Sequence, residues 1–216
     1  YISLLSDAGD AESASSNLDK YFETCSGKDA RYINYCNMSC YFHWMGGNFS
    51  AAVKWGAEGV ALKDTSGVDT QFDCRHNLAL AQRDFGLIDT ALSHFLRGKE
   101  LVTVTDATKI DAALGGDYYG NIGRCLQLMG NLSSAETCLV KSAVLLESIE
   151  IRDNVLNEGY IRQWLGELNL ALGHPNVGIA FLQASIGRWD LVAPPKADRV
   201  RRLISGVEDP SDSRIP

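Results

Sequence analysis

A glycine recurs at nearly regular intervals in this sequence, each time within the same short pattern of residues. A small residue or a cysteine lies seven positions before each glycine, and another small residue lies five positions after it. The glycines are Gly47, Gly86, Gly130 and Gly173, and they are 39, 44 and 43 residues apart. Self-similarity at such a period indicates repeated supersecondary units, because each unit buries its apolar face only against the next one.

Each copy of the pattern predicts two helices joined by a short turn. Glycine adopts the left-handed conformation that commonly ends a helix at little cost. Small residues on both sides of the turn allow the two helices to approach closely, and larger apolar residues fill the remaining space. The first proline is Pro175, so a long tract lacks the residue that most disrupts helices. We therefore predict an all-α fold.

The third copy of the pattern reads YGNIGRCL on its first helix and MGNLSSAETCL across its turn and second helix. These residues resemble the tetratricopeptide repeat (TPR) family, whose signature is W-x2-L-G-x2-Y followed by A-x3-F. The resemblance covers about residues 1–190 and implies a right-handed α-solenoid of antiparallel helix pairs, with about nine to ten helices. The observed period exceeds the family's usual period of about 34 residues, so HEAT-like helical pairs stay as the structural alternative.

The repeat register also divides the chain into segments. A partial repeat over 1–25, with its turn at Gly9, precedes four full repeats at about 30–63, 70–104, 116–148 and 158–190. The segment Ala193-Pro194-Pro195 interrupts the pattern, and 191–216 is expected to form a closing helix over Lys196–Ile204 and a tail. Because the chain opens in mid-repeat, we expect it to be a piece of a larger protein.

Charge and composition exclude several classes of partner. The net charge is −7, and nucleic-acid affinity depends mainly on Lys and Arg neutralising phosphates, so no nucleic-acid partner is expected. The one basic cluster is interpreted as the solvated face of a terminal helix. No apolar run approaches the roughly 20 residues that span a bilayer. Six cysteines without a CxxC pair predict reduced thiols and a cytoplasmic protein. The basic cluster comprises Lys196, Arg199, Arg201 and Arg202.

Two groups of residues could carry chemistry and are interpreted as structural. Cys36, Cys40 and His43 share one helical face, as zinc ligands can, but they occupy packing positions of the repeat, where cysteine acts as a small hydrophobe. The segment Gly115-Gly116-Asp117 predicts a loop-to-helix junction and lacks the Lys and Ser/Thr of a phosphate-binding loop. We therefore expect no catalytic site, no cofactor and no metal.

The TPR resemblance implies that the first helix of each pair lines a concave groove that binds extended peptides. Asn77 and Asn121 occupy equivalent positions, and an amide there can bond a peptide backbone with both its donor and its acceptor. The groove would be aromatic at both ends, with Tyr160 at the second. Aromatics and Arg are enriched at binding hot spots. The candidate residues are Asn37, Tyr41, Trp44, His76, Asn77, Arg83, Asn121, Arg124, Gln127, Gln163, Trp164 and Glu167.

These observations predict a non-catalytic protein–protein interaction module that binds a protein or peptide partner. The alternative is a sensor or regulatory TPR region of a larger bacterial-type signalling or effector protein, with a catalytic domain upstream of Tyr1. An enzyme with an unrecognised site is the third possibility. The sequence names neither the partner nor the oligomeric state. For Trp44 and Trp164, packing between repeats is as good an interpretation as ligand binding.

Overall fold

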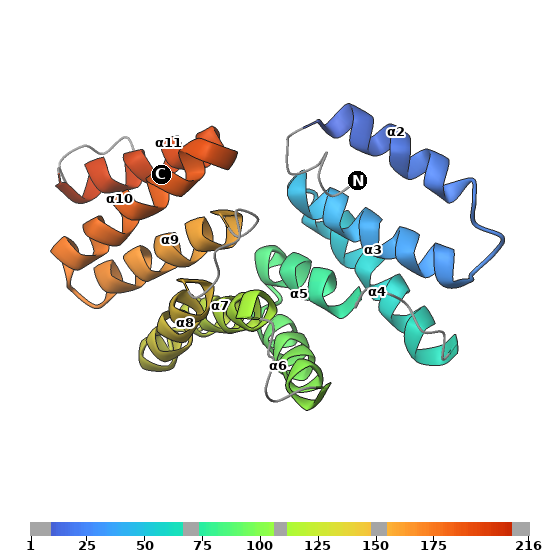
Figure 1. Cartoon of the computed structure of the whole chain (residues 1–216), viewed down its shortest axis with the longest axis horizontal. Helices are drawn as coiled ribbons and strands as arrows, with labels where there is room; N and C mark the ends of the chain where they lie inside the picture. Colours follow the sequence, from blue (N-terminus) through green and yellow to red (C-terminus); the bar gives the residue numbers. More distant parts are fainter. Residues whose placement is uncertain (1–9, 67–73, 106–111, 148–154, 209–216) are drawn as a thin grey trace. The chain divides into compact units, whose positions relative to one another are not determined.

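The computed structural model describes residues 10–66, 74–105, 112–147 and 155–208, and these ranges are helical without a strand (Figure 1). The predicted all-α fold is confirmed for them. None of these helices is long and apolar enough to cross a membrane. The helices are α2 (Ala11–Phe22), α3 (Ala30–Met45), α4 (Phe49–Ser66), α5 (Cys74–Phe85), α6 (Ile88–Thr105), α7 (Ala112–Leu128), α8 (Leu132–Glu147), α9 (Val155–Ala171), α10 (Pro175–Val192) and α11 (Pro194–Glu208).

Packing groups the helices into two compact units, 1–98 and 99–216. In the first unit α3 packs against α4, α5 packs against both, and α2 lies on α3. In the second unit α7 pairs with α8 and α9 pairs with α10, while α8 also contacts α9 and α11 covers α10. The boundary between the units falls within α6.

The same turn ends the first helix of four hairpins. The four turn glycines have φ between 75° and 94°, the left-handed region that the sequence predicted for them. At Gly130 the amide of Asn131 donates to the carbonyl of Leu126 at 2.9 Å, and the glycine amide donates to Gln127 at 3.0 Å. This is the Schellman arrangement, which satisfies carbonyls that would otherwise lack a partner at the helix end. The pattern repeats at Gly47, Gly86 and Gly173.

The residue after each turn glycine begins the next helix. Asn48 and Asn131 each accept a hydrogen bond at the side-chain oxygen from a backbone amide three residues later, at 3.3 Å. Such N-caps compensate for the missing bonds of the first helical turn. In the fourth hairpin Pro175 occupies the first helical position, where proline loses no hydrogen bond, so its departure from the repeat pattern is tolerated. Two or three residues therefore separate the two helices of each hairpin.

In these hairpins a glycine on one helix faces a larger residue on the other, and the helix that carries the glycine differs between hairpins. A methyl group on Gly123 would come within 2.8 Å of Leu139, so the glycine leaves room for that leucine. In the first hairpin the order is reversed, because the thiol of Cys40 lies where a side chain on Gly56 would have to go, at 2.9 Å. The helices approach closely in both cases.

The Cys/His group of the first hairpin takes part in this packing. Cys36 and Cys40 are fully buried, and Cys36 contacts the position of Gly59 on α4. His43 is half-buried, with its ring 5.4 Å from that of Phe42. The interpretation of the two cysteines as packing residues is confirmed.

Two expectations about helix limits were wrong, and one about exposure holds for three residues of four. The segment Gly115–Asp117 lies inside α7 instead of before it, and Gly116 is needed there because a methyl group would come within 2.7 Å of Leu146. The closing helix begins at Pro194, since proline fits a first helical turn. The basic cluster is only partly solvated, because Lys196 packs on aromatic rings. The turn predicted at Gly9 and the tail after 208 lie outside the described residues.

Replacing Gly166 by alanine should destabilise the chain. The new methyl group would lie 2.6 Å from Leu182 Cγ and 3.0 Å from the carbonyl oxygen of Gly178, so we expect a loss of about 1–3 kcal/mol from overpacking. The matched control is Gly187→Ala on α10, where nothing lies within 4 Å and the lower flexibility should add about 0.5–1 kcal/mol. Urea unfolding of both variants, followed by circular dichroism, should show opposite signs; equal stability would contradict the close approach.

Candidate functional site

The twelve candidate residues share one register relative to the turns. Each lies three, six, nine or ten positions before the turn glycine of its own hairpin. Residues three and four apart are neighbours on a helix, so these offsets place the candidates on one face of α3, α5, α7 and α9. Because the four turns have the same geometry, the face is positioned in the same way in each hairpin.

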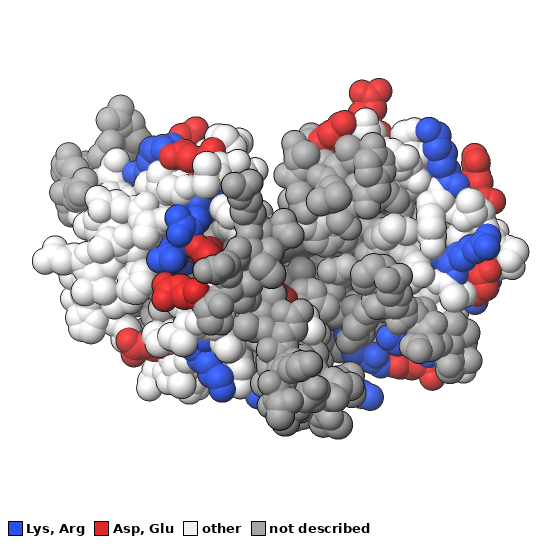
Figure 2. Space-filling model, in the orientation of Figure 1, with Lys and Arg blue, Asp and Glu red and all other residues white. Residues whose placement is uncertain are grey.

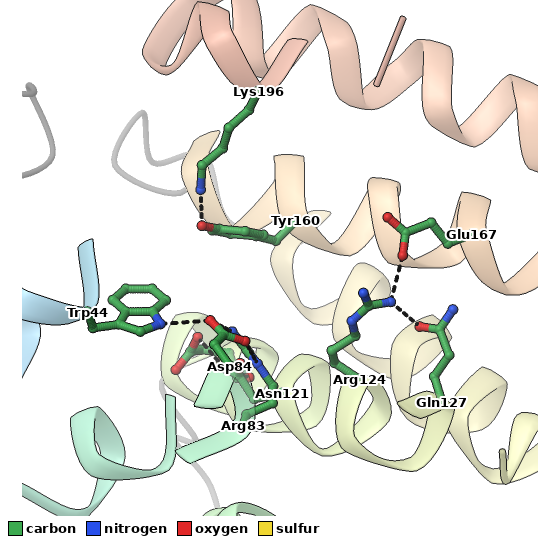
Figure 3. Close-up of polar contacts among 10 residues, drawn as sticks. Trp44, Arg83, Asp84, Asn121, Arg124, Gln127, Tyr160, Glu167 and Lys196 are labelled. Atoms are coloured by element: carbon green, nitrogen blue, oxygen red, sulfur yellow. Dashed lines mark hydrogen bonds and ion pairs between the residues drawn. The ribbon is translucent and has the colours of Figure 1, made fainter. Parts of the chain in front are cut away.

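In the first unit this face is held together by a shared carboxylate. The indole nitrogen of Trp44 on α3 donates to Asp84 Oδ2 on α5 at 2.7 Å (Figure 3). Arg83 donates to both oxygens of the same carboxylate, at 2.7 and 2.9 Å. Trp44 and Arg83 are 8% and 4% exposed, so both side chains are buried. Sequence analysis missed Asp84, since an acidic residue near a helix end is usually a surface residue.

A second contact joins the same two helices one to two turns away. The side-chain nitrogen of Asn77 on α5 donates to Asn37 Oδ1 on α3 at 2.9 Å. Asn37 is buried, whereas Asn77 is half-buried. The ring of Tyr41 lies 5.5 Å from that of Trp44, and His76 meets the edge of Phe95 at 5.7 Å. The α3–α5 face of the first unit is therefore a network of amides and rings.

In the second unit an ion pair joins α7 to α9. Arg124 donates to Glu167 Oε2 at 2.7 Å and to Gln127 Oε1 at 3.0 Å (Figure 3). Its guanidinium also lies 5.8 Å from the ring centre of Trp164, and Gln163 donates to the other oxygen of Glu167 at 2.8 Å. The side chains of Arg124 and Glu167 are 21% and 23% exposed, so the pair remains accessible from solvent.

The cluster of aromatic residues in the second unit contains more members than the sequence indicated. Tyr160 lies 5.2 Å from Trp164 and 4.8 Å from Trp189, which comes from α10. Trp189 is fully buried, and its indole nitrogen donates to Gln163 at 3.2 Å. The ammonium group of Lys196 on α11 lies 4.0 Å from the ring centre of Tyr160 and hydrogen-bonds its hydroxyl (Figure 3). Sequence analysis missed Trp189 and Lys196, because helices outside the first-helix register contribute them.

Asn121 differs from Asn77 although both lie nine positions before a turn. The side-chain nitrogen of Asn121 donates to the backbone and side-chain oxygens of Asp117 within α7, each at 3.0 Å, and the residue is 3% exposed. We expected both amides to face a peptide ligand. The structure places their donors in contacts inside their own units, which leaves Arg124, Gln127, Gln163 and Glu167 as the more accessible candidates of the second unit.

Burial shifts three titratable groups of the first hairpin toward their neutral forms. Burial raises the pKa of the Cys36 and Cys40 thiols to about 12, and it lowers the pKa of the His43 imidazole. At neutral pH both thiols are therefore protonated and are poor nucleophiles. No group of three or more His, Cys, Asp or Glu within the described ranges is arranged to hold a metal ion.

Comparisons with known proteins give information about the fold only. The sequence matches no family model and no curated protein. The structure is similar to the crystal structure of BtubC (BKLC) from P. vanneervenii, with a TM-score of 0.64 over 95% of this chain and 80% of that one. The two sequences are 16% identical over this match, so the similarity supports the helical fold and carries nothing about activity.

The Trp44–Asp84 hydrogen bond should contribute measurably to stability. Trp44→Phe removes the donor and leaves a charged acceptor one partner short, so we expect a loss of about 1.5–3 kcal/mol. Trp55→Phe is the control, because the indole nitrogen of Trp55 forms no hydrogen bond within the described part of the chain. Urea unfolding followed by circular dichroism compares them. Equal losses in the two variants would show that the hydrogen bond contributes nothing beyond ring packing.

The cysteines should divide into two classes by reactivity. All six are free, but only Cys25 and Cys138 are half-buried and the other four are buried. We therefore expect two thiols to react with Ellman's reagent in the native protein at mildly alkaline pH, and all six after unfolding. Replacing Cys25 and Cys138 by serine should abolish the fast reaction. Rapid labelling that persists in this double variant would contradict the packing role of the buried thiols.

Proposed function

We propose that this chain is a TPR-type protein-interaction module. In this proposal the helix pairs continue as a right-handed solenoid, and the first helices bind an extended segment of a partner protein. The chain has no catalytic role in the proposal. Its binding surface is the candidate face of α3, α5, α7 and α9.

The observation that carries the proposal is the side-chain bonding between first helices of successive hairpins. Trp44 and Asp84 connect α3 to α5, and Arg124 and Glu167 connect α7 to α9. Each pair joins equivalent helices 40 or 43 residues apart, which is about one repeat. Stacked first helices that share one face are what a solenoid needs to present a continuous binding surface.

The chemistry of the face suits a peptide more than a nucleic acid. The Arg124–Glu167 pair offers a donor and an acceptor side by side, and the nearby amides of Gln127 and Gln163 can do the same. Tyr160, which is half-buried, adds the kind of aromatic surface that is common at protein interfaces, whereas Trp164 beneath it is buried. On the side of the molecule that Figure 2 shows, Lys and Arg side chains lie next to Asp and Glu side chains, and the net charge of the whole chain is −7.

Selection from a displayed library of short random peptides tests the proposal. Peptides selected on the intact chain should bind the double variant Arg124→Ala/Glu167→Ala about tenfold more weakly, because interface energy concentrates in few residues. Removing both partners together avoids leaving one charge unpaired. Affinities are measured by fluorescence anisotropy, with helical content checked by circular dichroism.

The matched control removes another ion pair of the same length. Arg201 and Asp190 form a 2.7 Å pair between α11 and α10, and neither is a candidate residue. Arg201→Ala/Asp190→Ala should leave the affinity of the selected peptides unchanged. The proposal fails if the library yields no binder, or if both double variants bind as the unaltered chain does.

A further inference from the structure

Four aromatic rings from three helices gather in the first unit, outside the candidate face. Phe22 ends α2, Tyr32 and Tyr35 lie in the first two turns of α3, and Trp55 lies on α4. The ring centre of Tyr35 is 4.9 Å from that of Phe22, 5.3 Å from that of Trp55 and 5.9 Å from that of Tyr32. Phe22 is 48% exposed, and the other three side chains are half-buried. These four residues are called the aromatic cluster below.

Two hydrogen-bond donors of the aromatic cluster are left for a ligand. Within the described part of the chain, the hydroxyl of Tyr35 and the indole nitrogen of Trp55 form no hydrogen bond. Neither atom is among the buried polar atoms that lack a partner, so both are accessible from solvent. Tyr and Trp are common at interfaces because they combine an apolar ring with a donor, and here the donors lie beside the exposed ring of Phe22.

The carboxylate that is bonded to the aromatic cluster is already paired. The hydroxyl of Tyr32 donates to Glu58 Oε1 at 3.0 Å, and the ammonium group of Lys28 donates to the same oxygen at 3.2 Å. That ammonium group also lies 6.0 Å from the ring centre of Tyr32. The chain itself thus supplies the cation that the ring and the carboxylate attract. This arrangement favours an uncharged ligand, which brings acceptors to Tyr35 and Trp55.

A left-handed polyproline helix meets these requirements. It has no internal hydrogen bonds, so its carbonyl groups are free to accept, and proline has no backbone N–H that would need an acceptor. Proline-rich segments dock in aromatic-lined grooves, and their preformed helix loses little entropy on binding. The rings of Phe22, Tyr35 and Trp55 follow one another at 4.9 and 5.3 Å, so they can contact about one polyproline turn, which advances by roughly 9 Å.

We propose that the aromatic cluster is a second binding site, which takes a proline-rich segment of a partner protein in the polyproline conformation. Proline rings would pack on Phe22 and Tyr35. Backbone carbonyls of the segment would accept hydrogen bonds from the Tyr35 hydroxyl and the Trp55 indole nitrogen. The site shares no residue with the peptide-binding face proposed above, so either can exist without the other.

Binding of oligoproline to the intact chain tests this site. The probe is a fluorescein-labelled peptide of about ten L-prolines, and its counterpart of the same number of D-prolines forms the mirror-image helix. Fluorescence anisotropy should show that the L-peptide binds and that the D-peptide binds far more weakly. Tyr35→Phe and Trp55→Phe should each weaken binding of the L-peptide about threefold to tenfold, because each removes one donor and keeps an aromatic ring. Phe22→Ala should also weaken it, since it removes apolar contact.

The control variant is Tyr119→Phe on α7. Tyr119 is half-buried and lies in the second unit, and the substitution removes a hydroxyl as Tyr35→Phe does. It should leave the affinity unchanged, and circular dichroism should show the same helical content in all variants. The proposal is overturned if the L-peptide does not bind or if the D-peptide binds equally well. It is also overturned if Tyr35→Phe and Trp55→Phe bind as the unaltered chain does, or if Tyr119→Phe weakens binding as much as Tyr35→Phe.

Discussion

The hydrogen-bonded turn at the end of each first helix is the constraint on which the rest of the fold depends. At Gly47, Gly86, Gly130 and Gly173 the backbone enters the left-handed region, where a side chain would add strain. Two amide-to-carbonyl bonds close the turn, and the next residue already starts the second helix. These backbone bonds are the same in all four copies.

A fixed turn gives side chains fixed directions, and the proposed binding face follows from this. Positions three, six, nine and ten residues before a turn lie on one side of the first helix in each hairpin. Within each unit, residues of this side contact the next first helix: Arg124 meets Glu167 at the equivalent position, and Trp44 meets Asp84, which lies next to a register position. The contacts that stabilise the stacking and the groups offered to a partner therefore lie on the same surface. Loss of stability and loss of binding must be separated by experiment for this reason.

Between the two helices of a hairpin, the combined volume of two facing side chains matters more than the identity of either residue. Gly123 faces Leu139, and Gly166 faces Leu182, whereas in the first hairpin the cysteine Cys40 faces Gly56. Either order fills the space, because what packing requires is the sum of the two side chains. This requirement also explains why the cysteines of α3 act as core residues. Their burial raises their pKa, so at neutral pH they are protonated and are poor nucleophiles.

The sequence by itself determined the helical class, the turn positions and the close-packing residues. These depend on local backbone preference and on side-chain size, which the glycines and alanines of the repeat display directly. It did not determine what each candidate side chain touches. Asn77 and Asn121 occupy equivalent positions, yet one bonds across to α3 and the other bonds within its own helix.

Only the tertiary structure brought in the residues from outside the repeat register. Asp84 lies 40 residues from Trp44 in the sequence, and Lys196 lies 36 residues from Tyr160. Such partners are chosen by which helices pack together and by where their side chains point, and no local pattern records either. Two segments for which local signals had predicted a loop are likewise helical, because Gly116 allows close packing against Leu146 inside α7 and Pro194 fits the first turn of α11.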